Sequence, residues 1–249
     1  MTDGVKKFIE ENIDLIENGA FDTLYKGADA VVDVPVLTQT LLSAGIDPLK
    51  NLTHIPDHYL CETDIFSFQV PSHITRIGRA AFWMCENLNK VVLPEGLIFI
   101  DDSAFCECHN LWQINLPSTL EYLQEDAFAE TNLHHVVIPD NVAVLPRHCF
   151  EECKQLETVK LGKFTTKIGD GCFGECEKLR YVQLNEGLEQ IGPYAFKRCY
   201  SLKELYIPAS VNKIQSSPFW ELSNIKVLCV KDSYAHKWCE DNDQKYQLI

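Results

Sequence analysis

The sequence predicts a repeat solenoid of the α+β class whose two ends are covered by capping segments. Three observations predict it: an aromatic residue recurs at nearly constant spacing, short alternating apolar stretches follow it, and the first fifty residues follow neither pattern. A single short repeat cannot bury its own apolar side chains. Stacked repeats are therefore needed to form a continuous core.

The recurring aromatic residue sets the length of the repeat. Six of the seven steps between its copies are 23 residues long, and the step from Phe128 to Phe150 is 22 residues long. The copies are Tyr59, Phe82, Phe105, Phe128, Phe150, Phe173, Phe196 and Phe219. Eight copies exceed the three or so units that a stable array needs.

Two further positions repeat together with the aromatic residue. A cysteine follows it by three residues at Cys85, Cys108, Cys153, Cys176 and Cys199, and a leucine follows it by six at Leu88, Leu111, Leu156, Leu179 and Leu202. The short copy, AFAETNL, lacks the cysteine and one residue before Leu133. These positions predict one buried column of side chains for each repeated residue.

Each repeat also contains a predicted strand with one buried face. The strands are KVVLP (90–94), QINLP (113–117), HVVIP (135–139) and ELYIP (204–208), each with apolar residues at alternate positions. A second apolar pair precedes the aromatic residue at Leu97/Ile100, Leu120/Leu123, Leu188/Ile191 and Val211/Ile214. Each unit is thus expected to run from strand to turn to short apolar edge to bend.

The combined pattern, L-x-x-V-x-L-P followed by I-G-x-x-A-F-x-x-C, resembles the BspA-like, or Treponema pallidum type, leucine-rich repeats. The resemblance covers residues 52–234 and implies a leucine-rich-repeat solenoid of about eight repeats of 22–23 residues. The tail KDSYAHKWCEDNDQKYQLI resembles the closing segment of that family, which makes residues 235–249 a predicted C-terminal cap. The family implies protein recognition, often at cell surfaces, without catalytic machinery.

Two positions depart from the family pattern. Gly162 and Asn185 stand where the pattern has proline, and the glycine of I-G is replaced at Asp101, Gln124, Pro146 and Gln215. These departures leave the local turn geometry open.

Residues 1–51 are predicted to form a helical N-terminal cap. Phe8, Ile9 and Ile13 begin an apolar stripe at helical spacing, AFDTLYKGA suggests a second helix, and Asp33 can cap a third that ends near Gly45. The segment is also similar to openings of phage and prophage proteins, which would imply a protein acting on host machinery inside a bacterial cell. Covering the first repeat is the simpler alternative.

Charge and composition restrict the partner and the compartment. The formal net charge is −14, which disfavours direct binding of nucleic acid or an anionic membrane and suits a protein partner with basic groups. The first residues lack the apolar core of a secretory signal, and no stretch reaches the ~20 apolar residues of a membrane span. We therefore expect a cytoplasmic protein. A secreted or surface adhesin of the BspA-like type is the alternative.

The sequence predicts no metal, cofactor or catalytic site. HCFEEC (148–153) and GCFGEC (171–176) contain C-x3-C near His134 and His135, but zinc sites usually use C-x2-C spacing, and a ladder of buried cysteines explains these residues. Cys61, Cys106, Cys229 and Cys239 lie outside the ladder and are expected to be more exposed. No nucleophile elbow, P-loop or zinc-protease motif is present, so an enzyme is the third alternative.

Two surfaces are candidates for binding a partner. The first, called the strand face here, consists of the outward positions of the strands: Lys90, Gln113, His135, Lys160, Tyr181, Gln183, Glu204 and Tyr206. Polar residues mixed with tyrosine suit a protein interface, although exposed sheets also carry tyrosine for its strand propensity. We expect Tyr181 and Tyr206 to be its main contacts.

The second candidate surface is an acidic ridge on the bends. Glutamate follows the aromatic residue by two positions at Glu107, Glu130, Glu152 and Glu175, and again at Glu221. Neighbouring repeats would stack these carboxylates at about the spacing of adjacent strands, roughly 4.8 Å. Such a ridge either is a solvated face or steers a basic partner. The predicted function is non-catalytic binding of another protein in the cytoplasm.

Overall fold

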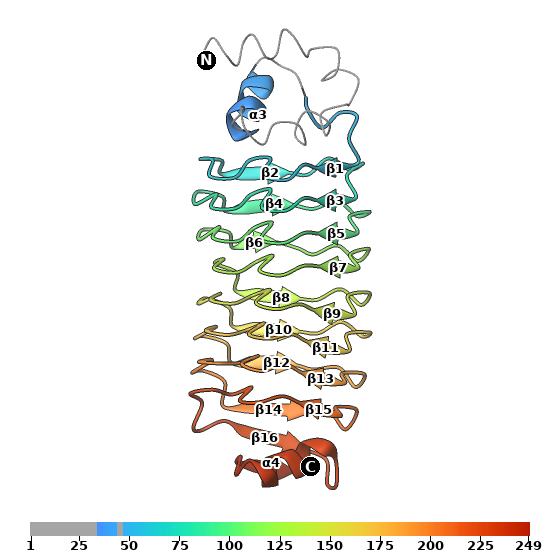
Figure 1. The fold of residues 1–249 in the computed structure, drawn as a ribbon, viewed down its shortest axis with the longest axis vertical. Helices are drawn as coiled ribbons and strands as arrows, with labels where there is room; N and C mark the ends of the chain where they lie inside the picture. Colours follow the sequence, from blue (N-terminus) through green and yellow to red (C-terminus); the bar gives the residue numbers. More distant parts are fainter. Residues whose placement is uncertain (1–33, 44–46) are drawn as a thin grey trace.

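The computed structural model describes residues 34–43 and 47–249 and shows a parallel β-solenoid of about eight turns (Figure 1). This confirms the predicted leucine-rich-repeat solenoid. Helical structure in the described residues is confined to α3 (Val34–Ser43) and α4 (Tyr234–Asp241) near the two ends of the stack. The first two predicted helices of the N-terminal segment lie outside the described residues.

Each turn contributes one strand to a first row, which carries the strand face. The row consists of β2 (Ser67–Gln69), β4 (Lys90–Val92), β6 (Gln113–Ile114), β8 (His135–Val137), β10 (Thr158–Lys160), β12 (Tyr181–Gln183), β14 (Glu204–Ile207) and β16 (Lys226–Cys229). In β4, β8, β10 and β12 a buried central residue lies between more exposed neighbours, as in Tyr181–Gln183, because successive side chains point to opposite sides of a strand.

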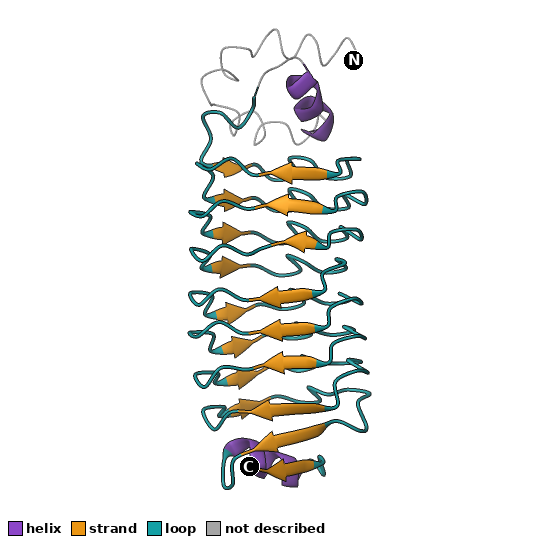
Figure 2. Cartoon of the chain, turned by 180° about the vertical axis from the view of Figure 1, so that it is seen from behind, coloured by secondary structure: helices purple, strands orange, loops and turns teal. Residues whose placement is uncertain are grey.

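A second row of two-residue strands lies after the turn in each repeat (Figure 2). It contains the second residue of the predicted apolar pair, such as Ile100 or Ile191, which is buried, while the first residue of the pair lies in the turn before the strand. The row consists of β1 (His54–Ile55), β3 (Arg76–Ile77), β5 (Phe99–Ile100), β7 (Tyr122–Leu123), β9 (Val144–Leu145), β11 (Lys167–Ile168), β13 (Gln190–Ile191) and β15 (Lys213–Ile214).

The bends join the second row to the first and are held by their own hydrogen bonds. The residues two before, at and two after the aromatic residue each donate their N–H to the next bend, as Ser103, Phe105 and Glu107 do at 2.9–3.0 Å. The outer two have left-handed backbones, with φ of 53° at Ser103 and 59° at Glu107. This conformation is uncommon outside glycine, and the three bonds between neighbouring bends hold it in place.

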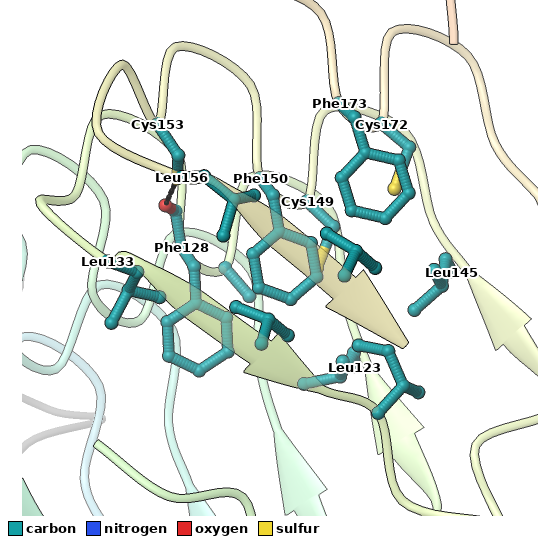
Figure 3. Close-up of a cluster of buried hydrophobic side chains, with 14 of the residues drawn as sticks. Leu123, Phe128, Leu133, Leu145, Cys149, Phe150, Cys153, Leu156, Cys172 and Phe173 are labelled. Carbon is teal, nitrogen blue, oxygen red and sulfur yellow. Dashed lines mark hydrogen bonds between the residues drawn. The ribbon is translucent and has the colours of Figure 1, made fainter. Parts of the chain in front are cut away.

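The aromatic rings form one continuous stack through the core. Neighbouring rings from Phe82 to Phe219 are stacked with centroids 5.1–6.0 Å apart, and Figure 3 shows Phe128, Phe150 and Phe173 in this row. The first copy differs from the prediction. His58 and Glu62 carry the left-handed backbones, and Leu60 donates to Ala81, so Leu60 and not Tyr59 occupies the stacked position.

Both strand rows are interrupted at the short repeat. In the described residues, β6 pairs with β4 alone and β8 with β10 alone, while the second row divides between β7 and β9. The bend hydrogen bonds and the ring stack continue across the same step, since Phe128 donates to Cys149 at 2.9 Å and its ring lies 5.4 Å from that of Phe150. The first row has another interruption between β12 and β14.

The departures from the family pattern adjust the turns. A side chain at Gly162 would place its Cβ 2.2 Å from the carbonyl oxygen of Pro139, so the turn requires glycine there. Asn185 donates its side-chain amide to the carbonyl oxygens of Lys163 and Thr165, both at 2.9 Å, and so connects two successive turns.

The C-terminal residues form a helix and a strand at the end of the stack. Ser233 caps α4 by accepting a hydrogen bond from the His236 N–H, and β17 (Tyr246–Leu248) pairs in parallel with β16. Ala235 and Cys239 are fully buried. Tyr234, at the start of the same helix, is exposed.

The described part of the N-terminal segment also contributes to the core. The third predicted helix is present as α3, and its Leu41 is fully buried in the same apolar cluster as Ile55 of β1.

Candidate functional site

The strand face is organised in two outward columns that follow the register of the first row. His135, Thr158 and Tyr181 are register partners in one column, and Val137, Lys160 and Gln183 are partners in the other. Lys90 and Gln113 are half-buried members of the first column. The structure therefore places the predicted residues on one face but distributes them over most of the stack.

Four of the eight predicted residues meet in one groove. Tyr181, Gln183, Glu204 and Tyr206 line a cavity of about 550 Å³, called the tyrosine groove here, where β12 and β14 do not pair. Tyr181 is 56% exposed and Tyr206 is half-buried. The two rings thus belong to one concave surface.

Polar contacts fix the rim of the tyrosine groove. Burial, followed by the neighbouring Glu186 carboxylate that accepts its hydrogen bond, raises the pKa of the Tyr206 hydroxyl. Arg180 pairs with Glu157 at 2.7 Å between guanidinium nitrogen and carboxylate oxygen, and Lys226 pairs with Glu204. A phenol that stays neutral and has an apolar body suits the centre of a protein interface.

His135 and Lys160 lie on the same face outside the tyrosine groove. His135 contacts the Thr158 hydroxyl through Nδ1 at 2.9 Å, and Lys160 is exposed on β10.

The acidic ridge has a first half, made of Glu107, Glu130 and Glu152, and a second half, made of Glu175 and Glu221. The two halves differ in their electrostatics. In the first half, burial followed by the Glu152 and Glu107 carboxylates raises the pKa of Glu130. In the second half, Glu175 lies 2.6 Å from the Lys197 ammonium and 3.4 Å from the Arg198 guanidinium, and the Lys197 hydrogen bond lowers the pKa of Glu175. Only the first half therefore keeps stacked carboxylates that repel one another.

The other glutamates of the ridge also form hydrogen bonds or ion pairs. Glu107 accepts a hydrogen bond from the Trp83 indole at 3.1 Å, and Glu152 pairs with Lys154 at 3.1 Å. Arg198 occupies the glutamate position of its own bend and binds Glu221 at 2.9 Å. Sequence spacing could not reveal the neutralisation of Glu175 and Glu221, because their cations, Lys197 and Arg198, come from the adjacent repeat.

The repeat cysteines are buried hydrogen-bond donors. Each thiol donates to a carbonyl oxygen of the preceding bend, and Figure 3 shows the bond from Cys153 to Phe128, which is 3.1 Å long. Equivalent bonds of 2.9–3.2 Å are made by Cys85, Cys108, Cys176 and Cys199. Burial raises the pKa of the Cys153 thiol to about 11, which keeps it protonated and able to donate.

Threonine takes the place of cysteine in two bends. The Thr131 hydroxyl in the short repeat lies 3.2 Å from the Cys153 sulfur, and the Thr63 hydroxyl lies 3.6 Å from the Cys85 sulfur. One expectation for the remaining cysteines was wrong. Cys61 and Cys106 are partly exposed, but Cys229 and Cys239 are fully buried because β16 and α4 pack together.

Metal and membrane sites receive no support from the geometry. Among the described residues, no three His, Cys, Asp or Glu side chains converge in the way that metal ligands do. The same part of the chain has no helix that is long and apolar enough to cross a bilayer.

A second pocket on the strand face was not predicted as a pocket, although the predicted residue His135 lines it. Val137 and Phe164 line it and are 63% and 56% exposed, respectively. The signal was present in the sequence, since the pocket lies at the one step of 22 residues.

Comparisons with solved structures agree with the fold. The chain is similar to a leucine-rich repeat protein from Bacteroides ovatus, with 22% identity over 80% of this chain and 70% of the other and a TM-score of 0.51. It is also similar to a leucine-rich repeat protein from Eubacterium ventriosum, with 18% identity over 72% of this chain and 60% of the other and a TM-score of 0.52. Identities this low show the fold alone.

A third similar structure is a leucine-rich repeat protein from T. pallidum, with 20% identity over 79% of this chain and 89% of the other and a TM-score of 0.44. No protein among the curated ones matches the chain. These comparisons give no support to the predicted resemblance of residues 1–51 to phage proteins.

The family comparison is more specific than the structural one. The sequence model described as BspA type Leucine rich repeat region, in six copies, matches residues 53–165 and 145–236. The two matches cover most of the chain and coincide with the repeats of the solenoid. The protein therefore belongs to the BspA-type leucine-rich repeat family.

Proposed function

We propose that this protein is a non-catalytic binding protein that recognises another protein through its strand face. The tyrosine groove is the observation that carries the proposal, because it gathers two tyrosines and two polar side chains on one concave surface. Binding energy usually concentrates in a few such aromatic contacts. Membership of a repeat family whose arrays present extended binding surfaces supports the same function.

The acidic ridge has a secondary role in this proposal. With a net charge of −14, the protein attracts basic partners over a distance that salt shortens to about 8 Å. Charges at the edge of an interface mainly alter the association rate. We therefore assign the steering of a basic partner to the first half of the ridge, where the carboxylates are less neutralised.

The test begins with affinity capture from a lysate, identification of the partner by mass spectrometry and surface plasmon resonance with the purified partner. Tyr181→Ala combined with Tyr206→Ala should abolish binding through faster dissociation. Glu130→Gln combined with Glu152→Gln should slow association and reduce its salt dependence. Tyr122→Ala is the matched control, because Tyr122 is 50% exposed on β7 of the second row. Normal binding by the double tyrosine variant would refute the proposal.

We further propose that the protein works in a reducing compartment such as the cytoplasm. Ten of the eleven cysteines, from Cys85 to Cys239, are thiols without a disulfide, which suits reducing surroundings. A surface adhesin of the same family would work in oxidising surroundings. Cell fractionation followed by thiol counting on the native protein distinguishes the two locations.

A further inference from the structure

The short repeat creates a pocket that the sequence pattern does not require. β6 and β8 do not pair across it, and a cavity of about 730 Å³, called the short-repeat pocket here, lies between them. Its inner wall contains the core residues Leu133 and Phe150. The volume is in the range of pockets that bind small ligands or single anchoring side chains.

The mouth of the short-repeat pocket is apolar and exposed. Val137 on β8 and Phe164 in the turn of the next repeat both line it and are 63% and 56% exposed. Exposed apolar residues that gather around a concave site mark a place for a partner, whereas single ones scattered over a surface do not. The pocket therefore suits a bulky apolar side chain.

The rim of the pocket carries negative charge. Glu95 accepts hydrogen bonds from Ser118, and Asp140 accepts one from the backbone N–H of Lys163 at 2.9 Å. In the described part of the chain, neither carboxylate forms an ion pair. The ammonium group of Lys163 lies over the ring of Phe164, 5.2 Å from its centroid. Besides the two carboxylates, His135 lines the pocket, and no lysine or arginine does.

We infer that the short-repeat pocket binds a bulky apolar side chain that is followed by lysine or arginine on the surface of a partner protein. The apolar group fills the space beside Val137 and Leu133, and the cation lies against Glu95 and Asp140. The inference rests on the proposed function, since the pocket and the tyrosine groove open on the same face. The three paired strands between them, β8, β10 and β12, span about 10 Å, so one partner can contact both.

The test uses a small probe in place of the unidentified partner. N-acetyl-phenylalanyl-lysine amide is titrated into the full chain carrying labelled methyl groups, and NMR follows the methyl shifts of Leu133, Val137 and Ile138. We expect saturable shifts there. N-acetyl-phenylalanyl-glutamate amide should bind more weakly, and Glu95→Gln combined with Asp140→Asn should remove that preference.

A matched pair of variants separates pocket binding from general effects. Val137→Trp places a large ring in the pocket mouth and should abolish the shifts of Leu133 and Ile138 on titration. Val92→Trp is the control, because Val92 is an exposed position on β4 outside the pocket and should leave them unchanged. Circular dichroism and melting establish that both variants fold.

Three results would overturn the inference. The first is an absence of saturable shifts at the pocket, and the second is equal binding of the lysine and glutamate probes. The third is self-association of the wild-type protein that is lost in Val137→Trp, which would assign the pocket to a second copy of the chain. Because the probe reports on this pocket alone, failure here leaves the tyrosine variants to decide the proposed function separately.

Discussion

The solenoid has a bend side, formed by the bends that carry the aromatic residues, and a strand side, formed by the first row of strands. The two sides differ in how continuously neighbouring repeats are connected. On the bend side, stacked rings and three N–H bonds connect neighbouring bends even across the short repeat. On the strand side, the first row divides twice, and both the tyrosine groove and the short-repeat pocket lie at those divisions. The bend side thus holds the stack together. This leaves the strand side free to open into binding surfaces.

Removing the C-terminal end of the stack should have the largest effect on the stability of the solenoid. We propose that α4 and β17 cap the solenoid, since Trp238 packs on Phe219, the last ring of the stack, at a centroid distance of 6.1 Å. Deletion of residues 233–249 should cause aggregation or loss of cooperative melting, because it exposes apolar residues of the last repeat. Tyr234→Ala, at an exposed position of α4, should stay soluble. A soluble truncation with an unchanged melting temperature would contradict the capping role.

Interrupting the ring stack should have the next largest effect. Phe150 is fully buried, and Phe150→Ala should lower the free energy of unfolding by about 3–5 kcal/mol. On the strand side, Val137→Ala should change it by less than ~0.5 kcal/mol, because that side chain is exposed. Chemical denaturation measures both. Similar costs for the two variants would mean that the bend side does not dominate stability.

The cysteine ladder should contribute a smaller amount. Cys176→Ala removes one thiol donor and leaves a small void, and we expect a cost of about 1 kcal/mol. Cys176→Gly should cost more, because it enlarges the cavity and loosens the unfolded chain. Cys106→Ala, outside the ladder and partly exposed, is the control. Stoichiometric zinc, or a disulfide between ladder positions, would contradict the assigned role.

The two halves of the acidic ridge should respond to pH in opposite ways, each by no more than ~1 kcal/mol. The pKa of Glu130 is raised, so the folded state holds its proton more tightly and this group destabilises the fold as the pH rises through its folded value. Glu130→Gln should therefore stabilise the protein at neutral pH and give no gain in acid.

Glu175 has a lowered pKa, so its contribution to stability is present above its unfolded value of about 4.5 and is lost as the pH falls. Glu175→Gln should accordingly destabilise the protein at neutral pH, and its effect should fade in acid. Denaturant unfolding at neutral pH and at about pH 3 compares the two variants, since the lower pH lies well below the unfolded value of both carboxyls. Effects of the same sign would mean that the ridge is electrostatically uniform.

The repeat length, the buried positions and the outward face could be predicted from the sequence alone. These features repeat every 22–23 residues, and burial of Phe150 or Leu156 in one repeat implies burial of its equivalents in the others. The expected strands and the outward position of Tyr181 follow from the same alternation.

The way in which neighbouring repeats meet could not be predicted from the sequence and is visible only in the folded protein. The position of Leu60 in place of Tyr59, the thiol donors, the neutralisation of Glu175 by Lys197 and the burial of Cys239 depend on contacts between segments that are distant in sequence. The same is true of the divisions beside β8 and β14, where the missing hydrogen bonds are between repeats and not within one. A repeat pattern specifies what each unit buries, but the gaps between units, which form the pockets, arise only when the units stack.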